Sequence, residues 1–387
     1  MFGFGEKKQP APLVEVKASA AGKVVGFGTA GRTGFQPREG SSLVRAGFAA
    51  NPIGFRAVRL ISEAASALPL ILQDATQRYD THPVLDLLAR PNPAQGQLEL
   101  FEAIYAQLLL TGNAYVEAVS DGALPTELHV LRSDRMSVVP GPDGWPTGYD
   151  YAVAGRKHRF DAAAICHIRA FHPHDDHYGL SPLTPAAAAV EVHNAASRWS
   201  RGLLENAARP SGAIVFRGAD GNGTLSNGQF DRLVAEMESQ HQGARNAGRP
   251  MLLEGGLDWK PMGFSPSDME FLQTKEAAAR EIATAFGVPP MLLGIPGDAT
   301  YANYQEANRA FYRLTVLPLA SRVTGALVNW LDDFAGTWLD LRPDPDQIAA
   351  LQTERDALWA RVGAASFLST AEKRALLGLP GEPDGAA

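Results

Sequence analysis

Four histidines and two aspartates lie close together in the middle of the chain and could bind a metal ion. They are His167, His172, His174, His177, Asp175 and Asp176. Imidazole nitrogens and carboxylate oxygens both donate lone pairs to zinc or manganese, so the cluster raises the hypothesis of a metal-dependent hydrolase or nuclease. The segment is also polar and broken by proline, which is typical of a solvated loop between two elements. We favour the loop, and we predict no metal site, no cofactor and no catalytic residue.

A glycine pattern at residues 26–31 matches the G-x-G-x-x-G spacing of dinucleotide-binding loops. Such a loop needs a helix directly after it and an acidic residue about twenty positions further on. Residues 32–40 are rich in Gly and Pro, and no Asp or Glu lies near position 51. We therefore expect a flexible arm. The chain also lacks the G-x-x-x-x-G-K-[ST], H-E-x-x-H and G-x-S-x-G motifs of common nucleotide-binding proteins and hydrolases.

Charged and aromatic residues between positions 275 and 304 form another candidate set. The charged members share one helix face, and the aromatic members could stack on bases. The set comprises Lys275, Glu276, Arg280, Glu281, Tyr301, Asn303 and Tyr304. We favour a solvated helix face, with ion pairs worth only a few tenths of a kcal/mol, for the charges, and packing for the aromatic residues. The alternatives are a polar wall that faces a water-filled channel and stacking on bases.

The overall composition limits the possible functions. The chain has 387 residues and a net charge of −7, which disfavours a scaffold that grips DNA tightly as a monomer. A single cysteine, Cys166, excludes an intrachain disulfide and favours a reducing compartment. We expect neither a secretory signal nor an apolar run long enough to cross a bilayer.

Hydrophobic periodicity predicts a mixed α+β region over residues 41–180. We expect helices at 42–66, 82–88 and 98–110, with the first broken near Asn51-Pro52. Short alternating runs predict strands, at 68–73, 114–119, 128–131, 136–139, 149–153 and 165–169.

Longer helices are expected after residue 180. One spans 181–208, with Ser181 as its cap and Pro182 in its first turn. A compact insert follows, with strands at 213–216, 251–254 and 257–262 and a helix opened by Ser226. The next helix starts with a capping box of Ser267 and Glu270 and ends at Gly287. A third begins near Asn303 and is kinked by Pro318. Two short helices are expected after Pro343, and Ser369 and Glu372 form a capping box at the start of the second.

Eight short runs, in this order and spacing, resemble the portal (head–tail connector) proteins of tailed bacteriophages, in the short siphophage-type subfamily. They lie at residues 82–93, 110–116, 165–169, 179–183, 265–268, 282–290, 300–303 and at Leu317-Pro318. The resemblance covers about residues 40–335. The high alanine content and compact tail also fit a phage-derived gene transfer agent, which the sequence does not separate from a phage.

The resemblance implies an α+β portal fold in a ring of subunits. Its parts, carried onto this chain, would be an extended arm (1–40), a mixed wing (41–180), a stem helix (181–208) and a small α/β clip (209–264). A second stem helix (265–287), a tunnel loop (288–303), a long kinked helix returning to the wing (304–342) and a short helical crown (343–387) would follow.

The resemblance also implies a function in the virion or virus-like particle. Twelve copies would form a ring at one capsid vertex and contact the major capsid protein. The ring would bind the terminase large subunit and later the head–tail adaptor, without catalysis of its own and without a membrane. Double-stranded DNA would pass through the channel without sequence specificity. Candidate channel-lining residues are Lys275, Arg280, Asp298, Thr300, Tyr301 and Asn303.

Overall fold

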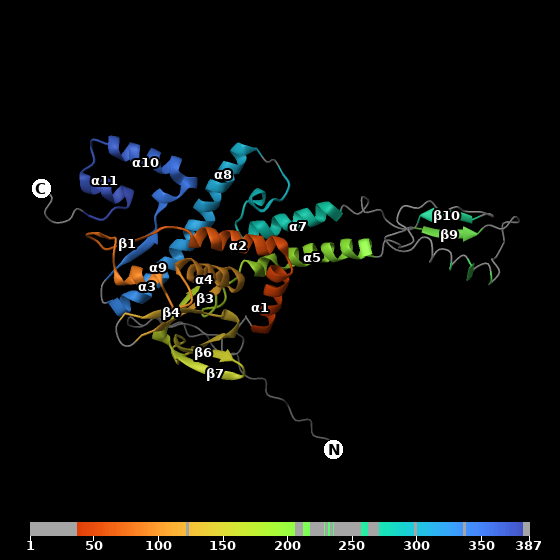
Figure 1. Cartoon of the computed structure of the whole chain (residues 1–387), viewed down its shortest axis with the longest axis horizontal. Helices are drawn as coiled ribbons and strands as arrows, with labels where there is room; N and C mark the ends of the chain where they lie inside the picture. The colour runs from red at the N-terminus through yellow and green to blue at the C-terminus, as the bar shows by residue number, and fades with distance from the viewer. Residues whose placement is uncertain are drawn as a thin grey trace, which may run out of the picture.

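The computed structural model describes most of the chain as a mixed assembly of helices and small antiparallel sheets (Figure 1). The described residues are 37–120, 124–205, 212–216, 228, 231–232, 235, 257–261, 271–297, 300–335 and 338–381. The glycine pattern at 26–31 lies outside them, as do Ser226, the strand at 251–254 and the capping box at Ser267, whereas residues 228, 231–232 and 235 are helical, as the helix expected after Ser226 predicts.

An irregular turn separates the first two helices of the described chain. Helix α1 (Pro37–Val44) continues as a wide π-helical turn, η1 (Arg45–Ala49), and α2 (Pro52–Ser66) starts after Asn51. Asn51 ends the first segment because its Oδ1 accepts hydrogen bonds from the Ile53 and Gly54 amides and caps α2. The predicted break is confirmed, but residues 37–40 are helical rather than part of an extended arm.

Three small sheets and two helices make up the rest of the first half. The helices are α3 (Pro83–Ala89) and α4 (Gln97–Thr111). One sheet has the order β4-β3-β8 and a second β5-β6-β7. Their strands are β3 (Asn113–Val119), β4 (Glu127–Leu131), β5 (Met136–Pro140), β6 (Pro146–Val153), β7 (Arg156–Asp161) and β8 (Ile165–Arg169).

The third sheet joins the two halves of the chain. Its order is β11-β1-β2, formed by β11 (Asp340–Pro343), β1 (Leu70–Gln73) and β2 (Arg78–Tyr79). The β1–β11 ladder pairs Leu70 with Pro343 and Gln73 with Asp340. The chain after the long helix therefore returns to the first half.

Two long helices run side by side away from this body (Figure 1). They are α5 (Leu183–Glu205) and α7 (Phe271–Ala285). Ser181 Oγ accepts from the Leu183 amide, so the predicted cap is confirmed. Beyond their outer ends lies an antiparallel pair, β9 (Gly212–Phe216) and β10 (Leu257–Pro261), which confirms two strands of the insert.

The chain then forms one long continuous helix, Tyr301–Ala335. It comprises α8 (Tyr301–Phe311), a π-helical turn η5 (Tyr312–Val316) and α9 (Leu317–Ala335). The wide turn lies directly before Pro318, which has no amide hydrogen to donate to the preceding turn, so the expected irregularity falls where the proline predicts it. Two short helices, α10 (Gln352–Ala364) and α11 (Thr370–Leu377), follow, and Ser369 and Glu372 form the predicted capping box.

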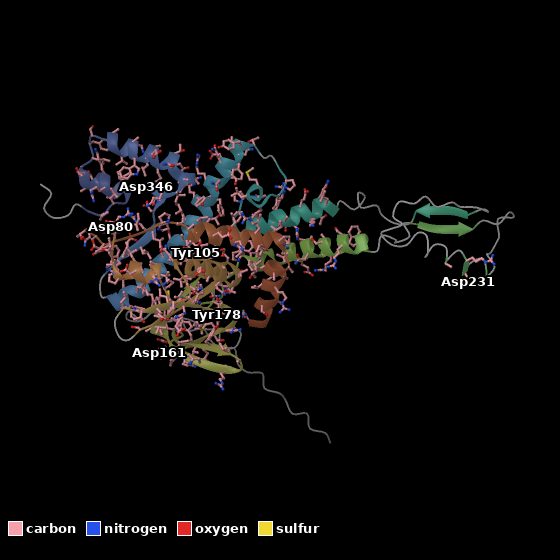
Figure 2. All side chains as sticks on the ribbon, in the orientation of Figure 1. Asp80, Tyr105, Asp161, Tyr178, Asp231 and Asp346 are labelled. Atoms are coloured by element: carbon pink, nitrogen blue, oxygen red, sulfur yellow. The ribbon has the colours of Figure 1, made fainter. Side chains whose placement is uncertain are left out.

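By length and composition, the Tyr301–Phe334 helix could cross a membrane, which the sequence analysis did not expect. The apolar side chains of this helix pack into the main hydrophobic core of the protein. Buried members are Phe311, Val316, Ala320, Val323, Leu327 and Leu331. The same core contains Tyr105 of α4, labelled in the packed centre in Figure 2, and Ile282 of α7. The inner ends of the two protruding helices are thus anchored in the central body.

Candidate functional site

Small side chains at helical spacing bring α5 and α7 into contact. On α7, Ala278 and Ile282 are buried one turn apart, Phe286 is buried just after the helix, and on α5 Ala186 and Val190 are buried. Alanine adds little bulk beyond the backbone, so two helices that meet through alanines can pack closely. The pair forms a narrow arm with side chains of both helices also facing outward.

A buried polar junction fixes the arm to the central body. The Asn51 side-chain amide donates to His193 Nδ1 (3.2 Å) and Asn194 Oδ1 (2.9 Å), and the Asn194 amide donates to the Ala46 carbonyl (2.8 Å). All three polar side chains are buried. Burial, and then the nearby charge of Lys275, lowers the pKa of His193. A neutral His193 can accept from Asn51, so the network is satisfied without a buried charge.

The two basic candidates on α7 differ in their surroundings. Lys275 is partly buried and lies close enough to His193 to influence its pKa. The exposed Arg280 guanidinium donates to the Pro296 carbonyl. A Cβ on Gly297 would lie 3.3 Å from the same guanidinium. The structure therefore places Arg280 against the segment that follows α7.

The segment between α7 and α8 is attached at both ends. Gly287 adopts a left-handed conformation (φ 67°), and its carbonyl accepts from Thr315 Oγ1 (2.6 Å) in the wide turn η5. The short helix η4 (Pro290–Leu293) follows, and the buried Ile295 packs against α7 residues Ala279 and Ala283. With the Arg280 bond to Pro296, these contacts hold residues 287–297 close to the inner half of α7.

The start of α8 presents polar and aromatic side chains to the surface. Thr300 Oγ1 accepts from the Asn303 amide (3.2 Å) and caps the helix. Tyr301 is 80% exposed and Tyr304 is 51% exposed. The Gln305 amide donates to the Tyr301 hydroxyl (3.1 Å). Asp298 lies outside the described residues. The sequence analysis named Thr300, Tyr301 and Asn303 as candidates. It predicted a helix break at Asn51-Pro52 but not the bonds of Asn51 to α5, and it gave no role to Thr315.

The histidine cluster is divided between a core contact and a loop. His167 stacks on Tyr115 (ring centroids 4.2 Å apart) and hydrogen-bonds to Asn113 Oδ1 (3.0 Å). Burial, followed by the charges of Arg169 and His177, lowers the pKa of His167 to about 3. His172 and His174 lie on the loop before α5. Within the described residues, no group of three or more His, Cys, Asp or Glu side chains could hold a metal.

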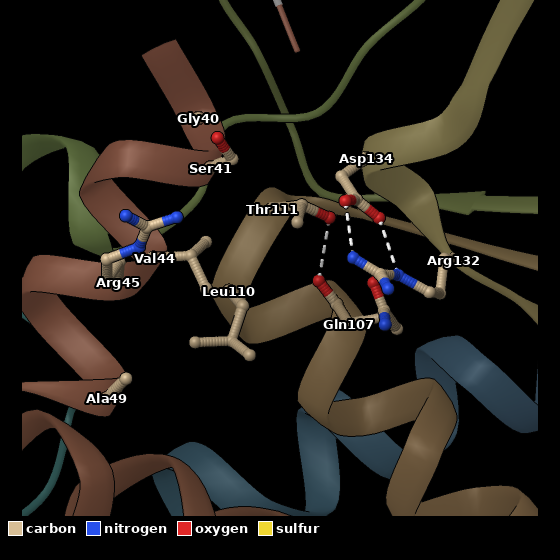
Figure 3. Close-up of a pocket in the computed structure, with 10 residues that line it drawn as sticks. All are labelled: Gly40, Ser41, Val44, Arg45, Ala49, Gln107, Leu110, Thr111, Arg132 and Asp134. Atoms are coloured by element: carbon tan, nitrogen blue, oxygen red, sulfur yellow. Dashed lines mark hydrogen bonds and ion pairs between the residues drawn. The ribbon is translucent and has the colours of Figure 1, made fainter. Parts of the chain in front are cut away.

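A hollow of about 320 Å³ lies between α1, η1, α4 and η2 (Ser133–Arg135) (Figure 3). Part of its polar lining is already hydrogen-bonded within the protein. Arg132 donates to both carboxylate oxygens of Asp134 (2.9 and 2.6 Å), and Thr111 Oγ1 donates to the Gln107 carbonyl (2.8 Å). This pairing raises the pKa of Arg132. These donors are already used, so they do not indicate a ligand site.

Comparison with known proteins identifies the family. A family model described as phage portal protein matches residues 52–378, which is most of the chain. This chain belongs to the phage portal family. The earlier resemblance and the α+β portal fold are therefore confirmed.

The portal chain is also similar to particular proteins over nearly its whole length. It is 69% identical to a chain from the neck of an empty gene transfer agent (GTA) particle computed with C6 symmetry, with a TM-score of 0.73 and coverage of 89% of this chain and 95% of that one. It is 66% identical to a chain from the neck of a native GTA particle computed with C12 symmetry (TM-score 0.72; coverage 91% and 97%). A probable portal protein of Streptomyces phage phiC31 is 27% identical, over 86% of this chain and 75% of the relative.

Proposed function

We propose that twelve copies of this chain form a ring at the portal vertex of a phage or GTA particle, and that DNA enters and leaves through the ring. The similarity at 66% identity to a chain in a C12-symmetric GTA neck carries this proposal. An elongated arm beside a broad body suits a ring, because one face of each copy can meet a different face of the next. As a structural part of a particle, the chain would need no catalytic site.

Ring formation can be tested directly with the purified full-length chain. Negative-stain images should show annular particles, and light scattering should give about twelve times the chain mass of 41.3 kDa. Compact single molecules at all protein concentrations, with no annular particles in the assembled capsid, would contradict the proposal. Stoichiometric zinc or manganese in the purified protein would instead revive the metal-dependent hydrolase hypothesis.

We assign the parts of the ring from the direction of the arm. The body would be the wing, α5 and α7 the stem, and the β9–β10 pair with its neighbouring residues the clip, which would contact the terminase large subunit and later the head–tail adaptor. The outer part of the body would meet the major capsid protein. Helices α10 and α11 would form the crown. Cross-linking from β9 to a co-expressed terminase subunit should succeed, whereas cross-linking from α11 should not.

The channel wall would include the surface from α7 to the start of α8. Tyr301, Thr300 and Asn303 would face DNA directly, with Asp298 and Lys275 beside them. Arg280 would act differently, because its guanidinium bonds to the Pro296 carbonyl and positions the tunnel loop. We expect particles with Lys275→Ala or Arg280→Ala to package less DNA than the parent, measured as nuclease-protected DNA per particle. Normal packaging by both would remove these residues from the channel assignment.

A further inference from the structure

One strand of the wing carries a run of basic side chains. Strand β7 begins with Arg156, Lys157, His158 and Arg159, and all four are exposed. β7 is the outer strand of the β5-β6-β7 sheet, and β6 is its ladder partner. The whole chain is acidic, with a net charge of −7. The basic strand is therefore a local feature that the overall charge conceals.

Two of these charges have no acidic partner in the hairpin. Arg156 lies opposite Val153 and Lys157 opposite an alanine, whereas Arg159 pairs with Asp150. Across the part of the chain that the structure describes, no ion pair involves Arg156 or Lys157. Both cations lie at the turn end of the hairpin. An unneutralised pair of exposed cations attracts a polyanion over about 10 Å at moderate salt.

The shape of the hairpin suits a phosphate backbone. Ala154 (φ 49°) and Gly155 (φ 78°) form a tight two-residue turn, so the hairpin end is narrow. Alternation along the strand places Arg156 and Lys157 on opposite faces. A two-stranded ribbon of this kind fits the major groove of B-form DNA, and its flanking cations can then meet phosphates on either side.

The same side chains argue against an added strand from a protein partner. Long charged residues on an edge strand hinder pairing with another strand. The charges are therefore better placed for a ligand that contacts side chains than for one that pairs with the backbone edge. The hairpin also lies across the body from the start of α8, and Figure 2 labels Asp161, the last residue of β7, at that edge. It cannot belong to the candidate channel wall of the same chain.

We propose that the β6–β7 hairpin is a second binding site for double-stranded DNA, outside the channel. Arg156 and Lys157 bind phosphates without sequence preference, and Arg159 contributes less because Asp150 already neutralises it. This site does not require the ring. Twelve hairpins in a ring would present a repeated set of weak phosphate contacts, which together bind more strongly than one.

The test uses the full-length protein and a covalently closed circular DNA, which cannot thread a closed ring and so reports the outer surface. Binding is measured across a range of salt concentrations for the parent, for Arg156→Ala/Lys157→Ala, and for the charge-matched control Arg322→Ala/Arg361→Ala, whose arginines are also exposed. Unfolding midpoints check that all three fold. We expect the hairpin variant to bind at least about ten times more weakly at low salt. The slope of log K against log salt should fall by about 2 for each hairpin that contacts the DNA, since each phosphate contact contributes about 0.9.

Two outcomes would overturn the proposal. Equal effects of the hairpin and control variants would show that net charge alone matters and that the basic strand only prevents edge-to-edge pairing. If the hairpin variant no longer bound a poly-glutamate peptide but bound DNA like the parent, the hairpin would be a binding site for an acidic protein and not for DNA. Negative-stain images of the same variants report ring formation separately, so failure of this site and failure of the portal function are distinguishable.

Discussion

At the scale of single residues, Asn51 connects two structures. Its Oδ1 caps α2, and its amide group bonds to His193 and Asn194 of α5. The amide donor and the carbonyl acceptor of this buried side chain are therefore both hydrogen-bonded. The loss of such a residue removes a helix cap and also leaves buried partners unsatisfied.

We expect Asn51→Ala to lower the free energy of unfolding by about 2–4 kcal/mol, the sum of a lost cap and of buried groups without partners. Urea unfolding measures the change. Ser369→Ala is the matched control, because Ser369 caps the exposed helix α11 and should cost only about 1 kcal/mol. Equal losses in the two variants would contradict the role of the buried junction.

His167 makes stability depend on pH. Its pKa is about 3 in the folded chain, below the ordinary value of 6.5, because burial disfavours the charged ring. Between those pH values the unfolded chain binds one more proton at this residue, so stability falls as pH decreases from 6.5 toward 3. The slope contributed is about 1.4 kcal/mol per pH unit.

We expect His167→Gln to remove that contribution, so that its unfolding free energy falls less steeply than the parent's over the same pH range. Denaturant unfolding at several pH values tests this. His174→Gln, on the exposed loop, is the matched control for the substitution itself. Identical slopes for His167→Gln and the parent would show that His167 titrates normally in the folded chain.

At the scale of elements, the segment after α7 depends on one glycine. Gly287 has φ 67°, and a Cβ there would lie 2.8 Å from Thr315 Oγ1. We expect Gly287→Ala to cost about 1–3 kcal/mol, from both backbone strain and the clash. Gly363→Ala is the contrasting variant, because Gly363 lies in α10 with open space around it and should gain up to about 1 kcal/mol. Thermal unfolding compares them, and a neutral Gly287→Ala would argue against a rigid attachment.

The same scale shows which elements the sequence could predict. Asn51, Ser181 and Ser369 marked helix starts correctly, because caps depend on nearby residues. Strand β7 was missed, because Arg-Lys-His-Arg has no apolar alternation and its conformation depends on pairing with β6. Strand β11 was missed for a related reason, since its partner β1 is far away in the sequence. Lys275 and Arg280 lie on a helix as expected, but the expected loop at 288–303 ends earlier, because α8 already begins at Tyr301. The Arg280 bond to Pro296 could be seen only in three dimensions.

At the scale of the whole molecule, exposed apolar residues indicate how copies could meet. Ala188, Val192 and Ala195 follow one another at helical spacing on the outer face of α5, and all are exposed. A stripe of this kind gains from burial against another subunit. A ring would bury it without any change in the fold of one chain.

We therefore expect Val192→Asp to weaken ring formation while leaving the unfolding midpoint of the single chain nearly unchanged. Light scattering and negative-stain images measure assembly. Val119→Asp is the control, since Val119 and Val192 are both 43% exposed but Val119 lies on β3 in the body. If both variants assemble like the parent, the outer face of α5 does not form a contact between subunits.

The arm also has a mechanical consequence. Helix α5 has 23 residues and so measures about 35 Å, and its buried polar attachment to the body lies near its middle, at His193 and Asn194. A sideways force on the free end of the helix produces a bending moment that is greatest at this attachment. Helices resist bending better than a few amide hydrogen bonds resist stretching. A force on the tip would thus tilt the arm as a unit before it bends the helix.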